Sequence, residues 1–102
     1  VSIRGPAGDC VLVIGGGAQI TASLLRGCGD RAVDITGNDA VLVKNDISFC
    51  DNRCVDLEGD RARVEGNTVQ MSEDGDCIDI EGDDAVVRKN RIARCDGDGV
   101  NI

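Results

Sequence analysis

The amino-acid sequence predicts an all-β fold, a right-handed parallel β-helix that forms a solenoid of about four coils with three short strands in each coil. Three observations predict it: a repeat, a period-2 alternation of apolar and polar residues within each repeat, and a glycine after the first strand of every repeat. The complete repeats span residues 11–32, 33–54, 55–77 and 78–99, so that three have 22 residues and one has 23. A fixed period of this length is typical of solenoids, whose units bury a hydrophobic face only by stacking on one another.

Each repeat contains three stretches in which apolar and polar residues alternate, which is the pattern of a strand. The first strand is predicted at Val11–Ile14, Val33–Thr36, Val55–Glu58 and Ile78–Glu81, and it resumes at Val100. The second strand carries Ala18 and Ile20, Ala40 and Leu42, Ala62 and Val64, and Ala85 and Val87. The third carries Ile3, Leu25, Ile47, Val69 and Ile92. Strands of the same kind are expected to lie parallel, so that each of three sheets grows by one strand per coil.

Two polar or small columns mark the corners between these strands. A glycine follows each complete first strand, at Gly15, Gly37, Gly59 and Gly82, where a sharp turn needs the positive φ that glycine accepts without strain. Between the second and third strands lies the column Ser23, Asn45, Asn67 and Asn90. Stacked amides can bond to one another and to turn backbone, which predicts a structural asparagine ladder.

The six cysteines fall into two columns of the repeat. One column holds Cys28, Cys50 and Cys95 with Ser72 between them, and the other holds Cys10, Cys54 and Cys77 with Ala32 and Gly99. Residues stacked in register lie about 4.8 Å apart and point in parallel, whereas a disulfide needs Cβ atoms about 3.8 Å apart. We therefore expect most of the thiols to be buried and reduced, with Cys28 stacked on Cys50 and Cys54 on Cys77, although six cysteines in so short a chain also fit a disulfide framework.

Composition excludes several classes of function. The chain of 102 residues has a formal net charge of −8 and no cluster of Lys and Arg, so it does not suit nucleic acid. No apolar run reaches membrane-spanning length. The sequence contains no His, Trp or Tyr, which disfavours a His base or a stacked sugar ring.

Charged residues in the same column become neighbours when the coils stack. Pairs of opposite charge are expected between Asp9 and Arg31, between Arg53 and Asp76, and along Asp39, Arg61 and Asp84.

One column on the outward side of the first strand contains only acidic residues in three successive repeats. Asp34, Asp56 and Asp79 stack there, with Glu58 and Glu81 beside them. Like-charged neighbours should raise the pKa of each carboxyl group and attract a cation. These five residues are the candidate metal ligands, and Ca²⁺, which prefers several carboxylate oxygens, is the candidate ion. Two alternatives remain open: a solvated acidic face with no cofactor, and a catalytic surface using paired carboxylates.

The repeat resembles a known family in the segments GDGVNI, GDCIDIEGD and V-x-x-N-x-I. It is similar to the right-handed parallel β-helix repeats of the pectate-lyase-like superfamily, including NosD-like proteins, over the whole chain. The resemblance implies an extracellular, periplasmic or cell-surface protein, often one that acts on polysaccharide. It transfers no catalytic motif, because the shared residues encode the coil rather than a reaction.

Three functional hypotheses follow. The first is a non-catalytic β-helix scaffold or interaction module of a carbohydrate-associated protein, with polysaccharide as a partner. The second is part of a polysaccharide-active enzyme, such as a lyase, glycosidase or epimerase, with an acidic site on the outer face of the first sheet. The third is a Ca²⁺-binding module.

The chain is interpreted as a single domain, residues 1–102, that forms a segment of a longer solenoid. Coil ends without a cover expose unpaired backbone groups and apolar side chains, which predicts end-to-end self-association. The residues expected to take part are Val1–Ile3 and Val11–Val13 at one end, and Ile92 and Val100–Ile102 at the other.

Overall fold

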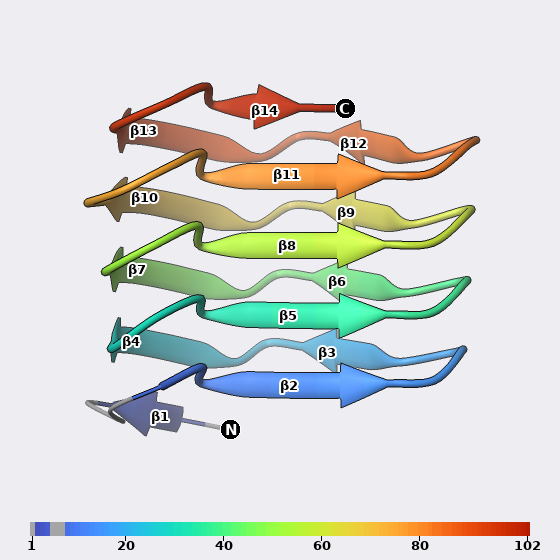
Figure 1. The fold of residues 1–102 in the computed structure, drawn as a ribbon, viewed down its shortest axis with the longest axis horizontal. Coiled ribbons are helices and arrows are strands. Elements are labelled where there is room, and N and C mark those ends of the chain that lie inside the picture. The colour runs from blue at the N-terminus through green and yellow to red at the C-terminus, as the bar shows by residue number, and fades with distance from the viewer. Residues whose placement is uncertain (1, 5–7) are drawn as a thin grey trace.

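The computed structural model describes residues 2–4 and 8–102, and it forms a solenoid of parallel strands arranged in three sheets. Figure 1 shows successive coils stacked one on another from β2 near the N-terminus to β14 near the C-terminus. Within the described residues every regular element is a strand, and no helix of membrane-spanning length is present. The predicted all-β parallel solenoid is confirmed.

The three sheets, here named A, B and C, collect the three kinds of strand. Sheet A contains β1 (Ser2–Arg4), β4 (Leu24–Cys28), β7 (Asp46–Cys50), β10 (Thr68–Ser72) and β13 (Arg91–Cys95). Sheet B contains β2 (Val11–Ile14), β5 (Val33–Thr36), β8 (Val55–Glu58), β11 (Ile78–Glu81) and β14 (Val100–Asn101). Sheet C contains β3 (Gln19–Thr21), β6 (Val41–Val43), β9 (Arg63–Glu65) and β12 (Val86–Arg88). Sheet B thus consists of the predicted first strands, with the predicted bounds for β2, β5, β8 and β11.

The core is a tube filled by the inward columns of the three sheets. Ile35 and Leu57 are register partners in sheet B, Leu42 and Val64 in sheet C, and each of these side chains is at most 2% exposed. Because no single coil could bury these residues, burial comes entirely from the coils above and below. The alternating pattern in the sequence therefore sets both the strands and the register.

The glycine column after sheet B is required by close contact as well as by conformation. Gly37 and Gly59 have φ of 157° and 148°, in the range that glycine accepts without strain. A Cβ atom added at Gly37 would collide with the carbonyl oxygen of Gly15, and one added at Gly59 with that of Gly37. The turns of successive coils can therefore stack backbone on backbone only because each carries glycine.

The predicted asparagine ladder forms at the corner between sheets C and A. Asn45 donates from its backbone N–H (2.9 Å) and its side-chain Nδ2 (3.0 Å) to Oδ1 of Asn67. Asn67 donates in the same two ways to Oδ1 of Asn90, at 2.9 and 3.1 Å. Each Nδ2 also donates to a backbone carbonyl across the corner, as Asn67 does to Leu42 at 2.9 Å. The ladder satisfies corner groups that would otherwise be buried without partners.

The prediction of free thiols is wrong, although the predicted stacking is right. Cys28 and Cys50 are register partners in sheet A, and Cys54 and Cys77 precede the register partners Val55 and Ile78 in sheet B. The structure nevertheless contains three disulfides, Cys10–Cys28, Cys50–Cys54 and Cys77–Cys95, and no free cysteine among the described residues.

The physical reason lies in the corner between sheets A and B, where the two cysteine columns face each other. Cysteines within one column have parallel side chains that are too far apart to bond, as expected. Each disulfide instead joins one column to the other, with Cα atoms 5.5, 5.3 and 5.4 Å apart, inside the usual range for a disulfide. Cys50–Cys54 closes one turn, whereas the other two each join residues 18 apart, in neighbouring coils.

The predicted self-association at the coil ends stays a prediction. Val1, one of the residues expected to take part, lies outside the described residues.

Candidate functional site

The acidic column predicted as a metal site lies on the outer face of sheet B in the predicted order. Asp34, Asp56 and Asp79 are register partners on β5, β8 and β11, and Glu58 is the register partner of Glu81. The two glutamates are exposed, whereas Asp56 and Asp79 are each only 7% exposed. In the aspartate ladder, meaning Asp34, Asp56 and Asp79, the last two side chains are therefore buried and Asp34 is half-buried.

Two arginines from the preceding turns cover this ladder. Arg31 Nη1 lies 2.9 Å from Asp34 Oδ2, and Arg31 Nε lies 3.1 Å from Asp56 Oδ2. Arg53 Nη1 lies 3.6 Å from Asp56 Oδ2, and Arg53 Nε lies 3.2 Å from Asp79 Oδ2. Each arginine bridges two consecutive aspartates, so two positive charges alternate with three negative ones.

The ion pairs and the burial have opposite effects on the central carboxyl group. Burial raises the pKa of Asp56 and is the largest influence; Arg31 and Arg53 lower it, and Asp34 and Asp79 raise it further. The net effect is a raised pKa, as the sequence predicted, but its main cause is burial rather than repulsion within the ladder. For Arg31, burial disfavours the charged form, but Asp56 and Asp34 outweigh it and raise its pKa.

The column-pair predictions have a mixed outcome. Arg61 pairs with Asp39 as expected, with contacts of 2.8 and 3.1 Å. Asp9 instead accepts a hydrogen bond from the backbone N–H of Arg31 (3.0 Å), and Asp76 accepts one from the backbone N–H of Asp98 (2.7 Å). The guanidinium groups of Arg31 and Arg53 lie on the aspartate ladder instead, each between two consecutive aspartates.

Within residues 2–4 and 8–102, no group of three or more His, Cys, Asp and Glu side chains is arranged to hold a metal ion. A Ca²⁺ ion at the aspartate ladder would have to displace the two arginines that now neutralise it. The Ca²⁺ site stays a prediction.

We expect Asp56→Asn to raise the free energy of unfolding at pH 7 by up to about 1 kcal/mol. The substitution removes a buried charge but leaves the Arg31–Asp34 and Arg53–Asp79 pairs in place. Because the pKa of Asp56 is raised in the folded state, the folded protein binds more protons than the unfolded chain between the ordinary and the raised pKa. Protonated Asp56 therefore contributes to the free energy of unfolding of the wild type at low pH. This contribution is lost as pH rises from the ordinary pKa of aspartate to the raised pKa.

Urea unfolding of both proteins from pH 3 to pH 7 measures this effect. The stability difference in favour of Asp56→Asn should be smallest at pH 3 and should grow with pH. A variant that is less stable than wild type at pH 7 would show that ion pairing outweighs the burial of the charge.

A second candidate site, not predicted from the sequence, lies on the outer face of sheet A. The register of β7 and β10 pairs Gln70 with Ser48 and Ser72 with Cys50, so Phe49 and Met71 are left out of the ladder. Both have left-handed backbone, with φ of 58° and 65°, and Arg94 has φ of 57° at the same place in β13. Each strand thus bends at this residue, which turns one extra side chain outward. Because every strand bends at the same place, the register stays one to one, and we call this bend the bulge.

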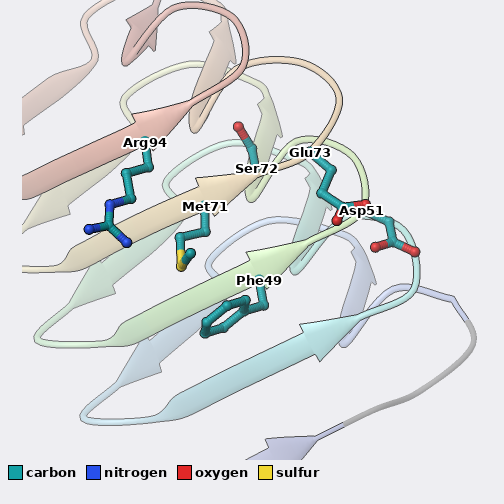
Figure 2. Close-up of a pocket in the computed structure, with 6 residues that line it drawn as sticks. All are labelled: Phe49, Asp51, Met71, Ser72, Glu73 and Arg94. Atoms are coloured by element: carbon teal, nitrogen blue, oxygen red, sulfur yellow. The ribbon is translucent and has the colours of Figure 1, made fainter.

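These bulged side chains form a groove, which we call the sheet A groove. It is lined by Phe49, Asp51, Met71, Ser72, Glu73 and Arg94 and has a volume of about 320 Å³. Figure 2 shows Phe49, Met71 and Arg94 projecting to the same side from successive strands, with Asp51 and Glu73 at the turn beyond them. Phe49 is 41% exposed, and the guanidinium carbon of Arg26 lies 4.7 Å from the centre of its ring. The groove therefore combines an apolar floor with cations at its sides and carboxylates at one end.

The charge of sheet A differs from that of the rest of the molecule. Among the arginines at positions 8–102, those at 31, 53, 61, 63 and 88 make ion pairs with carboxylates. Arg26, Arg91 and Arg94 make none within the described residues, and all three are exposed on sheet A. A chain with a formal charge of −8 thus presents these three arginines on one face.

The groove was not predicted from the sequence, because the bulge interrupts the period-2 alternation by one residue. A signal was nevertheless present, since the third strand has two residues, rather than one, between inward positions such as Leu25 and Cys28. Left-handed backbone costs about 1 kcal/mol for a residue other than glycine. Gly27 occupies this position in β4, and Phe, Met and Arg occupy it in the following coils. Two other columns have the same left-handed backbone, at Asp39, Arg61 and Asp84 and at Ala22, Lys44 and Lys89, so the conformation belongs to the turns of the coil and is not special to the groove.

Comparison with known proteins identifies the family. The family model described as "Right handed beta helix region" matches residues 1–102. No curated protein and no solved structure matches the chain. The match covers the full length and agrees with the parallel three-sheet coil, so the chain belongs to the right-handed β-helix family.

Proposed function

We propose that this β-helix is a non-catalytic interaction module of a carbohydrate-associated protein and that it binds acidic saccharide in the sheet A groove. The observation that carries the proposal is the exposed Phe49 ring in the groove, with the guanidinium of Arg26 over one of its faces and Arg94 in the same groove. The exposed part of the ring can pack on the C–H side of a sugar ring, as aromatic rings do on other apolar surfaces. Arg94 supplies a planar guanidinium that matches a carboxylate in two hydrogen bonds.

The carboxylates at the end of the groove can bind the hydroxyl groups of a sugar. Asp51 and Glu73 are exposed carboxylates at the turn end of the groove and can accept hydrogen bonds from a sugar. Binding in a shallow groove of this kind, rather than in an enclosed pocket, fits recognition of a polymer without chemistry on it. The module therefore acts as a rigid platform for one or two saccharide units.

The disulfides support an oxidising compartment as the location of this module. Disulfides form and persist in secreted, periplasmic and cell-surface proteins, where the environment is oxidising. Three of them in a chain of 102 residues favour an extracellular or periplasmic location, which is where polysaccharide ligands occur.

The test is titration of the protein with uronate oligosaccharides and with neutral oligosaccharides of equal length, followed by NMR and calorimetry. Phe49→Gly is the most informative variant, because glycine accepts the φ of 58° at this position. We expect it to weaken saccharide binding about tenfold, equivalent to about 1.4 kcal/mol, without lowering the melting temperature.

Two arginine variants separate a specific contact from general charge. Arg94→Gln should weaken binding of the uronate oligosaccharide, whereas Arg88→Gln removes the same charge from sheet C and should leave binding unchanged. Equal binding by wild type and Phe49→Gly, or no binding to any saccharide, would refute the proposal.

A further inference from the structure

The three disulfides at the corner between sheets A and B differ in access to solvent. Cys50 and Cys54 are both 0% exposed, so their disulfide is closed to an external thiol. Each of the other two disulfides joins a half-exposed cysteine to a buried one: Cys10 to Cys28, and Cys95 to Cys77. Thiol–disulfide exchange requires a thiolate to reach a sulfur atom, so these two disulfides can be attacked at Cys10 and Cys95.

The buried member of each outer disulfide is a neighbour of the central one. Cys28 is the register partner of Cys50 on the adjoining strand of sheet A. Cys77 stands next to Cys54, because the backbone N–H of Val55 bonds to the carbonyl of Cys77 at 2.8 Å. Register neighbours lie about 4.8 Å apart. A thiolate released at Cys28 or Cys77 would therefore appear beside one sulfur of the buried Cys50–Cys54 disulfide.

We propose that the corner is a thiol–disulfide exchange relay, through which the outer disulfides carry an attack by an external thiol to the buried central disulfide. In the first step, a thiolate such as that of glutathione attacks Cys10 Sγ. A glutathione–Cys10 disulfide forms, the Cys10–Cys28 bond breaks, and Cys28 leaves as a thiolate. In the second step, the Cys28 thiolate attacks Cys50 Sγ, forming Cys28–Cys50 and releasing Cys54 as a thiolate.

Neither step changes the number of disulfides, and each transfers one bond from sulfur to sulfur. Net reduction occurs only when a second glutathione attacks a mixed disulfide, giving oxidised glutathione and a protein thiol. The Cys28–Cys50 bond joins two stacked residues whose spacing exceeds the Cβ separation that disulfides prefer. It is therefore a reactive intermediate, open to further exchange, rather than a stable end product. The same sequence starts at the other end with attack on Cys95, release of Cys77 and attack on Cys54.

A matched pair of variants tests the relay. Cys10→Ser and Cys28→Ser both lack the Cys10–Cys28 disulfide and so lose the same covalent link between coils. Cys10→Ser retains a thiol beside Cys50, whereas Cys28→Ser retains only the half-exposed Cys10 thiol. We expect reduced glutathione to open Cys50–Cys54 about tenfold faster or more in Cys10→Ser, since an intramolecular thiol acts at a high effective concentration.

Alkylation with iodoacetamide at successive times, followed by peptide mass mapping, measures the opening of Cys50–Cys54, and circular dichroism verifies that both variants remain folded. In wild type, the same mapping should find glutathione attached at Cys10 and Cys95 and not at Cys28 and Cys77. Equal rates in Cys10→Ser and Cys28→Ser would overturn the relay, because they would mean that opening of the corner alone exposes the central disulfide. The second pair, Cys95→Ser and Cys77→Ser, should repeat the result at the other end; equal rates there would remove that arm of the relay.

Discussion

Replacing Cys10 and Cys28 together by alanine is expected to lower the free energy of unfolding by about 3 kcal/mol, because the crosslink restricts a long loop of the unfolded chain. The disulfide spans a sequence separation of 18, as does Cys77–Cys95, whose removal should have a similar effect. Cys50–Cys54 spans a separation of only 4, so the same treatment predicts a smaller loss of about 2 kcal/mol. Each inter-coil disulfide links one coil covalently to the next. Without it, the two coils are held together only by their stacking contacts.

Urea unfolding followed by far-ultraviolet circular dichroism measures these losses for the three double alanine variants under oxidising conditions. The variant lacking Cys50 and Cys54 is the matched control, since it also loses two cysteines and one disulfide but closes a short loop. If oxidised and fully reduced wild-type protein unfold at the same urea concentration, the disulfides do not brace the coil.

Asn67→Ala is expected to lower the free energy of unfolding by about 3 kcal/mol or more, through buried groups left without partners. Asn67 is 1% exposed, and its Oδ1 accepts from both the backbone and the side chain of Asn45. Its Nδ2 donates to the carbonyl of Leu42 and to Asn90. Alanine cannot replace any of these four bonds.

Asn38→Ala is the control for this variant, because it removes the same side chain from an exposed turn. Asn38 accepts one hydrogen bond, from the backbone N–H of Asp60 at 2.9 Å, and its loss should cost about 1 kcal/mol or less. Chemical denaturation of both variants decides the matter. Similar losses for Asn67→Ala and Asn38→Ala would show that the ladder adds no more than an ordinary surface hydrogen bond.

The sequence alone determined the coil, because everything that specifies the coil recurs with the period of the repeat. Val33–Thr36 and Val55–Glu58 are strands at the predicted residues, and their register follows from the alignment of the repeats. The corner asparagines and the glycines at 37 and 59 could be assigned for the same reason. In a solenoid the neighbour of a residue is its counterpart one period away, so sequence columns become spatial columns.

The tertiary structure decided whatever depends on contacts between different columns. The two cysteine columns face each other across a corner. The repeat length of the sequence does not give the distance between two columns, so free thiols were predicted where the Cys10–Cys28 disulfide forms. Arg31 lies in a different column from the aspartate ladder, yet its side chain reaches Asp34 and Asp56 and changes an acidic face into a partly buried ion network. The groove at Phe49 arises from a bulge that a period-2 pattern cannot represent. A repeat in sequence fixes separations along the axis of the coil, whereas separations around the coil depend on how each turn and side chain closes in three dimensions.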